Sequence, residues 1–242
     1  MKNSVLLQLQ KKLQRAAFLA GSFLSILSLT GCSSETLFQS NFGSVAAGQP
    51  PAHVQQVGTV NIDAPAGNVI TVGSPVNSGG NFVQVIRSSG QQSVSGMQCN
   101  FSKFIGVGQY SFSAILFIPA GTGLVTIQFE PFNQPVGTLT NFLHLDFTQD
   151  NMVRLDDNDA SKFGSWPRGQ VFIVQVTLNI NATTPTAHIV LSGAGASGTK
   201  DYNILAPFIP IAQQFGAVRF WIGFPWNGSA DINTIVVTHP TS

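Results

Sequence analysis

Short runs of β-branched and aromatic residues recur along this 242-residue chain from about residue 57 onward. Gly, Pro, Asn or Asp clusters separate these runs at intervals of about 8–12 residues. In one run, Val125, Ile127 and Phe129 alternate with polar side chains. Because successive side chains of a strand point to opposite faces, such a run turns one face to a core and the other to water. The pattern therefore predicts a fold built of β-strands.

The same alternation recurs further along the chain. Leu143, Leu145 and Phe147 are expected to point into the core. His144 and Asp146 then share the opposite side of that strand. Further strands are expected over residues 82–87, 110–118, 170–178, 187–191, 220–224 and 232–238. We predict an all-β fold, a two-sheet antiparallel β-sandwich of the jelly-roll type, with two small sandwiches as the alternative.

Charged residues are scarce, at 9% of the chain against roughly 25% in an average soluble protein. Glu35 and Glu130 are the only glutamates. This composition argues against long solvated helices and against a mechanism that needs several glutamates. A formal net charge of +1, with no basic stripe, argues against a nucleic-acid partner.

The N-terminal residues have the pattern of a secretion signal. Four basic residues come first, namely Lys2, Lys11, Lys12 and Arg15. The apolar run that follows, residues 16–29, is too short to span a bilayer. We expect residues 1–31 to be removed as a signal peptide.

The apolar run ends in Leu29-Thr30-Gly31-Cys32, which resembles the lipobox of bacterial lipoproteins. The resemblance implies that Cys32 is acylated and becomes the N-terminus of the mature protein. Two or three acyl chains anchor a protein stably, because each buried CH₂ contributes about 0.8 kcal/mol. Ser33 stands where a signal for inner-membrane retention is usually Asp, so the resemblance implies a cell-envelope, lipid-anchored protein at the outer membrane. An ordinary signal peptide with an incidental cysteine is the alternative.

Residues 32–56 are rich in Ser, Gln, Gly, Ala and Pro and lack sustained apolar periodicity. That composition is typical of a flexible tether. We therefore expect an acylated, flexible segment over residues 32–56, followed by a β-sandwich domain over residues 57–242.

A second resemblance covers roughly residues 80–240. It rests on the strand at 143–147, the turn at 149–151, the Gly-Ser-Trp-Pro segment at 164–167, the strand at 171–178 and the closing strand at 230–238. Together these segments resemble laminin-G and concanavalin A-like modules, which implies a carbohydrate-associated jelly roll. The chain departs from the legume-lectin pattern because it lacks a recognisable metal-ligand loop.

A polar sheet face is the best candidate for a ligand site. Strand parity turns seven polar or aromatic side chains outward: Gln128, Glu130, His144, Asp146, Gln175, Arg219 and Trp221. An aromatic ring packs against the apolar C–H faces of a sugar, and the polar groups bond its hydroxyls. A glycan is the expected ligand. In the alternative interpretation, a loop covers Trp221 and the polar groups are solvated or paired.

Residues 156–159 concentrate oxygen ligands in the order Asp, Asp, Asn, Asp, so Asp156, Asp157 and Asp159 are candidate Ca²⁺ ligands. They lack the alternating spacing of an EF-hand. The alternative is a solvated turn, since Asp and Asn favour turns for local hydrogen-bonding reasons. No other cofactor is expected.

Catalysis is not expected. Glycosidases need a pair of carboxyl groups, and only Glu130 with Asp146 offers an unorthodox one. No Gly-x-Ser-x-Gly motif is present. We predict a non-catalytic binding module for a polysaccharide or glycoconjugate on a lipoprotein. A structural or adhesive protein that binds envelope proteins is the first alternative, and a glycoside hydrolase the second.

Overall fold

The computed structural model describes residues 33–43, 45–64, 69–73, 81–90, 95–135, 137–138, 140–223 and 225–241. The expected signal peptide and the lipidation of Cys32 therefore lie outside the described residues. Glu35–Pro240 forms one compact unit. In the other unit, the backbone N–H of Thr241 donates to the carbonyl of Ser33 at 2.7 Å.

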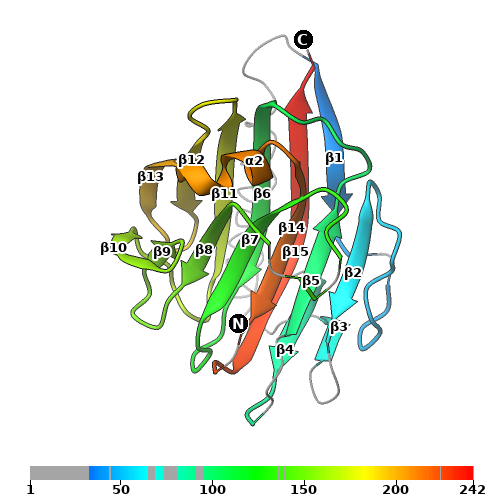
Figure 1. Cartoon of the computed structure of the whole chain (residues 1–242). Helices are drawn as coiled ribbons and strands as arrows, with labels where there is room; N and C mark the ends of the chain where they lie inside the picture. The colour runs from blue at the N-terminus through cyan, green and yellow to red at the C-terminus, as the bar shows by residue number, and fades with distance from the viewer. Residues whose placement is uncertain are drawn as a thin grey trace, which may run out of the picture. The chain divides into compact units, whose positions relative to one another are not determined.

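Two antiparallel sheets make up the fold (Figure 1). Sheet A has the order β13-β12-β11-β6-β15-β4-β3, with β1 also paired to β15. Its strands are β1 (Ser34–Ser40), β3 (Val69–Gly73), β4 (Phe82–Arg87), β6 (Gly108–Phe117), β11 (Val171–Ile180), β12 (Thr186–Ser192), β13 (Gly198–Asn203) and β15 (Gly228–Pro240).

Sheet B has the order β10-β9-β8-β7-β14-β5-β2. Its strands are β2 (Thr59–Asp63), β5 (Ser95–Asn100), β7 (Val125–Pro131), β8 (Leu143–Phe147), β9 (Val153–Leu155), β10 (Asn158–Phe163) and β14 (Phe215–Ile222). The predicted two-sheet, all-β sandwich is confirmed.

Alternation along the strands builds the core. On β11, Phe172, Val174, Val176 and Leu178 are buried, whereas their neighbours are more exposed. On β7, Val125, Ile127 and Phe129 are buried, as predicted. Aromatic rings join the two sheets: the ring of Phe112 on β6 meets that of Phe129 edge-on, with centroids 5.3 Å apart.

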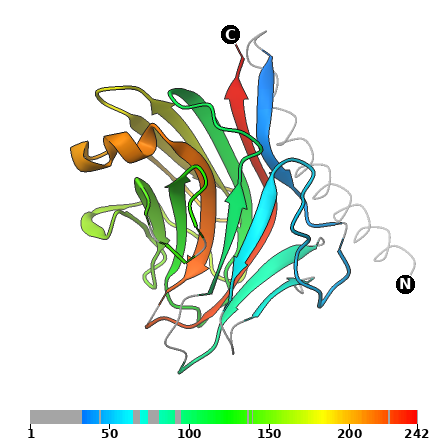
Figure 2. The ribbon, with the colours of Figure 1, turned by 45° about the vertical axis from the view of Figure 1, so that its right-hand side comes forward.

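The predicted tether over residues 32–56 is wrong at Ser34–Ser40, because this segment forms strand β1. Leu37 and Phe38 are both fully buried. Adjacent residues of a strand face opposite sides, so both sides of β1 are covered here. Gly58 leaves room for the Phe38 ring, since a Cβ at Gly58 would lie 2.7 Å from it. The strand β1 runs beside β15 in both views (Figure 1, Figure 2).

Within the described residues, helical structure is confined to one short segment, the 3₁₀ turn η1 (Ala206–Phe208) and α2 (Ile209–Ala212). Pro stands in the first turn of both, where its missing N–H has no helical partner. Among the described residues, no helix has the length and apolar character needed to cross a membrane.

Candidate functional site

The outer face of sheet B, the face turned away from the core, carries most of the predicted site. Arg219 on β14 lies directly opposite Gln128 on β7, and Gln128 lies opposite His144 on β8. In the next row, Trp221 lies opposite Thr126. Strand parity thus brings Gln128, Glu130, His144, Asp146, Arg219 and Trp221 onto one face of three neighbouring strands.

Gln175 does not join them. It lies on β11 of sheet A, between Ser113 and Val190 of the neighbouring strands. Its alternation with buried Val174 and Val176 turns it outward on the other side of the sandwich. The prediction that Gln175 belongs to the same site is wrong, because parity assigns a side chain to a face but not to a sheet.

Glu130 and Arg219 form a buried ion pair on this face. Glu130 is 0% exposed and Arg219 is 1% exposed. The guanidinium Nε donates to Glu130 Oε1 at 2.7 Å, and the Gln98 amide donates to Oε2, also at 2.7 Å. Asp63 lies 3.4 Å from Nη1 of Arg219. Burial raises the pKa of Glu130 above its usual value, and the Arg219 charge opposes that rise.

Asp146 is held in a second network on the same face. Its Oδ1 accepts from Thr126 Oγ1 at 2.7 Å, and its Oδ2 accepts from Arg154 Nη2 at 2.8 Å. Burial raises the pKa of the Asp146 carboxyl, and nearby His144, Thr126 and Arg154 oppose that rise. Asp146 and Glu130 are thus fixed by protein partners and do not lie open to a ligand.

Trp221 projects from the predicted face but is only partly exposed. A Cβ at Gly96 would lie 2.9 Å from the Cβ of Trp221, so glycine is required opposite it. At Gly223 a Cβ would lie 2.3 Å from the indole ring. The indole Nε1 is buried and has no hydrogen-bond partner among the described residues. The ring packs against the chain and is not an open stacking surface.

The acidic segment at residues 156–159 is a hairpin turn. Leu155 of β9 pairs with Asn158 of β10, which leaves Asp156 and Asp157 as a two-residue loop. Their φ angles are 49° and 55°. Positive φ at both central positions defines a type I′ turn, for which Asn, Asp and Gly are preferred. Turn geometry therefore accounts for the Asp residues here.

The three predicted Ca²⁺ ligands do not converge. Asp156 accepts from the backbone N–H of His144 at 2.8 Å and from Tyr202 Oη at 2.7 Å. Asp159 lies 3.4 Å from the Lys162 ammonium. In the described part of the chain, the group with metal-like spacing is instead His144, Asp146 and Asp157, whose ligand atoms lie within 4.8 Å of one another.

An arginine already offsets part of the negative charge of that group. Arg154 Nη2 lies 2.8 Å from Asp146 Oδ2 and 2.8 Å from Asp157 Oδ1. The guanidinium therefore occupies one oxygen of each carboxylate. A metal ion at this group would have to displace Arg154.

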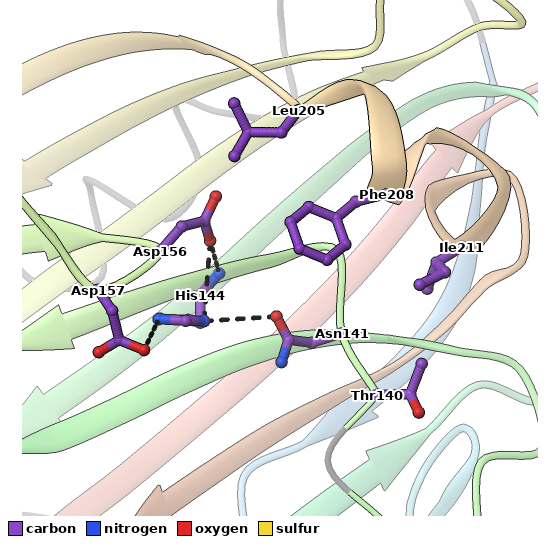
Figure 3. Close-up of a pocket in the computed structure, with 8 residues that line it drawn as sticks. All are labelled: Thr140, Asn141, His144, Asp156, Asp157, Leu205, Phe208 and Ile211. Carbon is purple, nitrogen blue, oxygen red and sulfur yellow. Dashed lines mark hydrogen bonds and ion pairs between the residues drawn. The ribbon is translucent and has the colours of Figure 1, made fainter.

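An open cleft of about 460 Å³ lies at the His144 end of the outer face (Figure 3). It is lined by Thr140, Asn141, His144, Asp156, Asp157, Leu205, Phe208 and Ile211. The imidazole of His144 lies between two polar groups, with Nδ1 3.4 Å from Asn141 Oδ1 and Nε2 3.4 Å from Asp157 Oδ2. Asp157 is largely exposed, so its carboxylate is open to a ligand.

The opposite wall of the cleft is apolar. Leu205, Phe208 and Ile211 come from the segment that contains η1 and α2 (Figure 3). Leu205 is 48% exposed. This wall was not predicted, because residues 205–211 show neither strand nor helix periodicity. The one signal for it in the sequence is an apolar run that Pro207 and Pro210 interrupt, since proline cannot continue a central strand.

The two antiparallel sheets form a sandwich of the concanavalin A-like jelly-roll type. No family model matches the chain, and no curated protein matches it. Among solved structures, the lectin UEA-II complexed with galactose is similar, with a TM-score of 0.50 and 13% identity over 86% of this chain and 99% of the lectin. An endo-1,3-beta-glucanase from Streptomyces sioyaensis is similar with a TM-score of 0.52 and 12% identity, over 88% of this chain and 99% of the glucanase. Identity this low shows a shared fold only.

Proposed function

We propose that this protein is a lipid-anchored cell-envelope protein whose β-sandwich binds a polysaccharide or glycoconjugate without cleaving it. The amphipathic cleft at His144 is the observation that carries the proposal. One wall offers aromatic and aliphatic side chains, and the other offers imidazole, amide and carboxylate groups. A sugar ring has the same division, with apolar C–H faces and polar hydroxyl edges.

Each wall has a defined task in this proposal. Phe208 packs against the C–H face of a sugar ring. Asn141, His144 and Asp157 exchange hydrogen bonds with its hydroxyl groups. The acidic hairpin disfavours anionic sugars, because a carboxylate or sulfate near Asp157 would be repelled. A neutral or amino sugar is therefore the preferred ligand class.

The carboxylates of this face favour binding over hydrolysis. Asp146 lies opposite Thr126, and Thr126 is four residues from Glu130 along β7. At about 3.3 Å per residue, that offset is about 13 Å along the strand. The two carboxyl groups of glycosidases lie only about 5–10 Å apart. Arg219 and Arg154 also hold the two carboxylates at 2.7 and 2.8 Å.

A glycan array with the full chain, followed by titration calorimetry on the best ligand, tests the binding proposal. Phe208→Ala should weaken binding by about 1–2 kcal/mol, or roughly 5–30-fold, because it removes part of a buried aromatic contact. Val54→Ala is the matched control, since Val54 is 71% exposed and does not line the cleft. Equal affinity of the two variants, or no bound glycan on the array, would overturn the proposal and favour a protein partner.

Lipid anchoring is supported by the basic and apolar leader and by the Leu-Thr-Gly-Cys segment. Cys32→Ser should block acylation and leave the unprocessed precursor in cells. Membrane fractionation and intact-mass measurement would detect both effects. Normal processing of the Cys32→Ser chain would show that an ordinary signal peptidase acts.

A second variant, Ser33→Asp, tests the outer-membrane assignment. It should redirect the protein to the inner membrane.

A further inference from the structure

The loop between β5 and β6, residues 101–107, exposes two large apolar side chains. Phe104 is 48% exposed and Val107 is 57% exposed. Lys103 precedes Phe104 and has a half-exposed side chain. The loop thus carries an aromatic residue and an aliphatic residue three positions apart, both about half exposed, and a lysine next to the aromatic one.

The loop is firmly held, so its exposure is a property of the folded state. The buried ring of Tyr110 donates from Oη to the carbonyl of Gly106 at 2.5 Å. The backbone N–H of Ser102 donates to the carbonyl of Leu37 at 2.9 Å. Phe104 contacts Phe132, with ring centroids 5.7 Å apart. These contacts hold the loop in place, and Phe104 and Val107 stay about half exposed in it.

The loop is also tied to the start of the domain. Lys103 Nζ lies 2.7 Å from Glu35 Oε2. Glu35 follows Cys32 by three residues, and three residues span at most about 11 Å. An acyl anchor on Cys32, which belongs to the function proposed above, would therefore keep this loop close to the bilayer surface.

We propose that Phe104 and Val107 insert into the interface of the phospholipid bilayer beside the acylated N-terminus. Apolar side chains enter the acyl boundary, and the Lys103–Glu35 ion pair lies in the headgroup region. Two side chains offer too little area for a stable protein interface, which buries about 1,200–2,000 Å². Next to an acyl anchor the same two side chains add a second membrane contact, and that contact orients the domain.

Site-specific fluorescence on the full-length, acylated chain tests this insertion. Val107→Cys is labelled with the environment-sensitive dye NBD, and the chain is reconstituted into vesicles of phosphatidylethanolamine and phosphatidylglycerol. Cys99 is fully buried and does not compete for the dye. We expect a blue shift of the NBD emission and quenching by nitroxides on the lipid tails.

Gln170→Cys is the matched control. Gln170 is exposed and precedes Val171, which pairs with Phe117 at the far end of β6 from Val107. The two labels lie about 30 Å apart along that strand. The Gln170 label should keep its aqueous emission. Aqueous emission from both labels, or equal blue shifts from both, would overturn the insertion.

Sedimentation with the vesicles separates this inference from the proposed anchor. A chain that sediments while its Val107 label stays in water would retain the anchor and disprove insertion. A chain that does not sediment at all would disprove both. A double variant, Phe104→Ser with Val107→Ser, should still sediment, because acylation alone holds the chain on the vesicle. A loss of sedimentation would contradict the inference that the loop orients the domain but does not anchor it.

Discussion

Glu130 and Arg219 are buried together at the centre of the outer face of sheet B. Removing one partner of a buried pair leaves an uncompensated charge, whereas replacing both by apolar residues is often tolerated. The pair contacts Gln98 and Asp63 and does not line the open cleft. Its role is to position the polar face, and its loss should appear first in stability.

Glu130→Gln should therefore lower the free energy of unfolding by about 3–5 kcal/mol, measured by urea denaturation. The double variant Glu130→Leu with Arg219→Met is the control, and it should lose much less than Glu130→Gln alone. An unchanged denaturation midpoint for Glu130→Gln would show that water reaches this pair in solution.

Asp231 on β15 makes stability depend on pH. Burial raises the pKa of its carboxyl to about 6, and a hydrogen bond from Gln84 at 2.9 Å opposes the rise. A raised carboxyl pKa favours the neutral form in the folded state. Its contribution to stability is thus fully present below the unfolded pKa of about 3.9 and is lost as pH rises through about 6.

Asp231→Asn should remove this pH dependence. Between pH 4 and pH 7.5 the wild-type chain should lose about 2 kcal/mol from this one group, since each pKa unit corresponds to about 1.36 kcal/mol and part of the shift already acts below pH 4. Thermal melting of both proteins at the two pH values would measure the difference. Parallel pH profiles for wild type and Asp231→Asn would contradict the assignment.

Strand β1 shows how an element escapes sequence analysis. Leu37 and Phe38 are adjacent, so they create neither the alternation of a half-buried strand nor a long apolar run. Both are nevertheless buried, because β1 is covered on both faces. By contrast, β7, β8 and β14 were predictable because their apolar core residues alternate with polar or aromatic ones, although Gln128, Glu130 and Arg219 are themselves buried. Alternation along the strands correctly predicted that His144 and Arg219 share a face. It could not show that Gln175 lies in the other sheet, because strand order depends on pairing between segments far apart in the sequence.

The burial of β1 has a measurable consequence. Phe38→Ala should lower the free energy of unfolding by about 3–5 kcal/mol, because it leaves a cavity in the core. Gln39→Ala, in the same strand with an exposed side chain, should change it by less than about 0.5 kcal/mol. Equal and negligible effects in chemical denaturation would restore the tether interpretation.

The cleft combines elements that are distant in the sequence. His144 comes from β8, Asp157 from the β9–β10 hairpin and Phe208 from the segment before β14. Sequence reasoning found His144 and Asp157 by residue type and strand parity, but it assigned Asp157 to a metal site. Phe208 could not be found, since nothing local shows that an apolar residue outside a strand will face a polar hairpin.

At the scale of the whole molecule, metal removal tests whether His144, Asp146 and Asp157 hold a cation. Because Arg154 bonds Asp146 and Asp157, the fold should not depend on a divalent cation. Excess EDTA should leave the thermal midpoint unchanged within about 1 °C. A large fall in the midpoint that calcium reverses would show that a cation stabilises the acidic hairpin after all.

The pairing of β1 with β15 also determines when folding can finish. A chain that is synthesised or exported from its N-terminus presents its first strand long before its last. Until Gly228–Pro240 emerges, β1 and the adjacent edges of β4 and β6 have no partner in sheet A. Long-range pairing of this kind folds slowly and leaves apolar strands open to aggregation. The unpaired edges of sheet A therefore stay open to aggregation until the final thirteen-residue strand has closed the sheet.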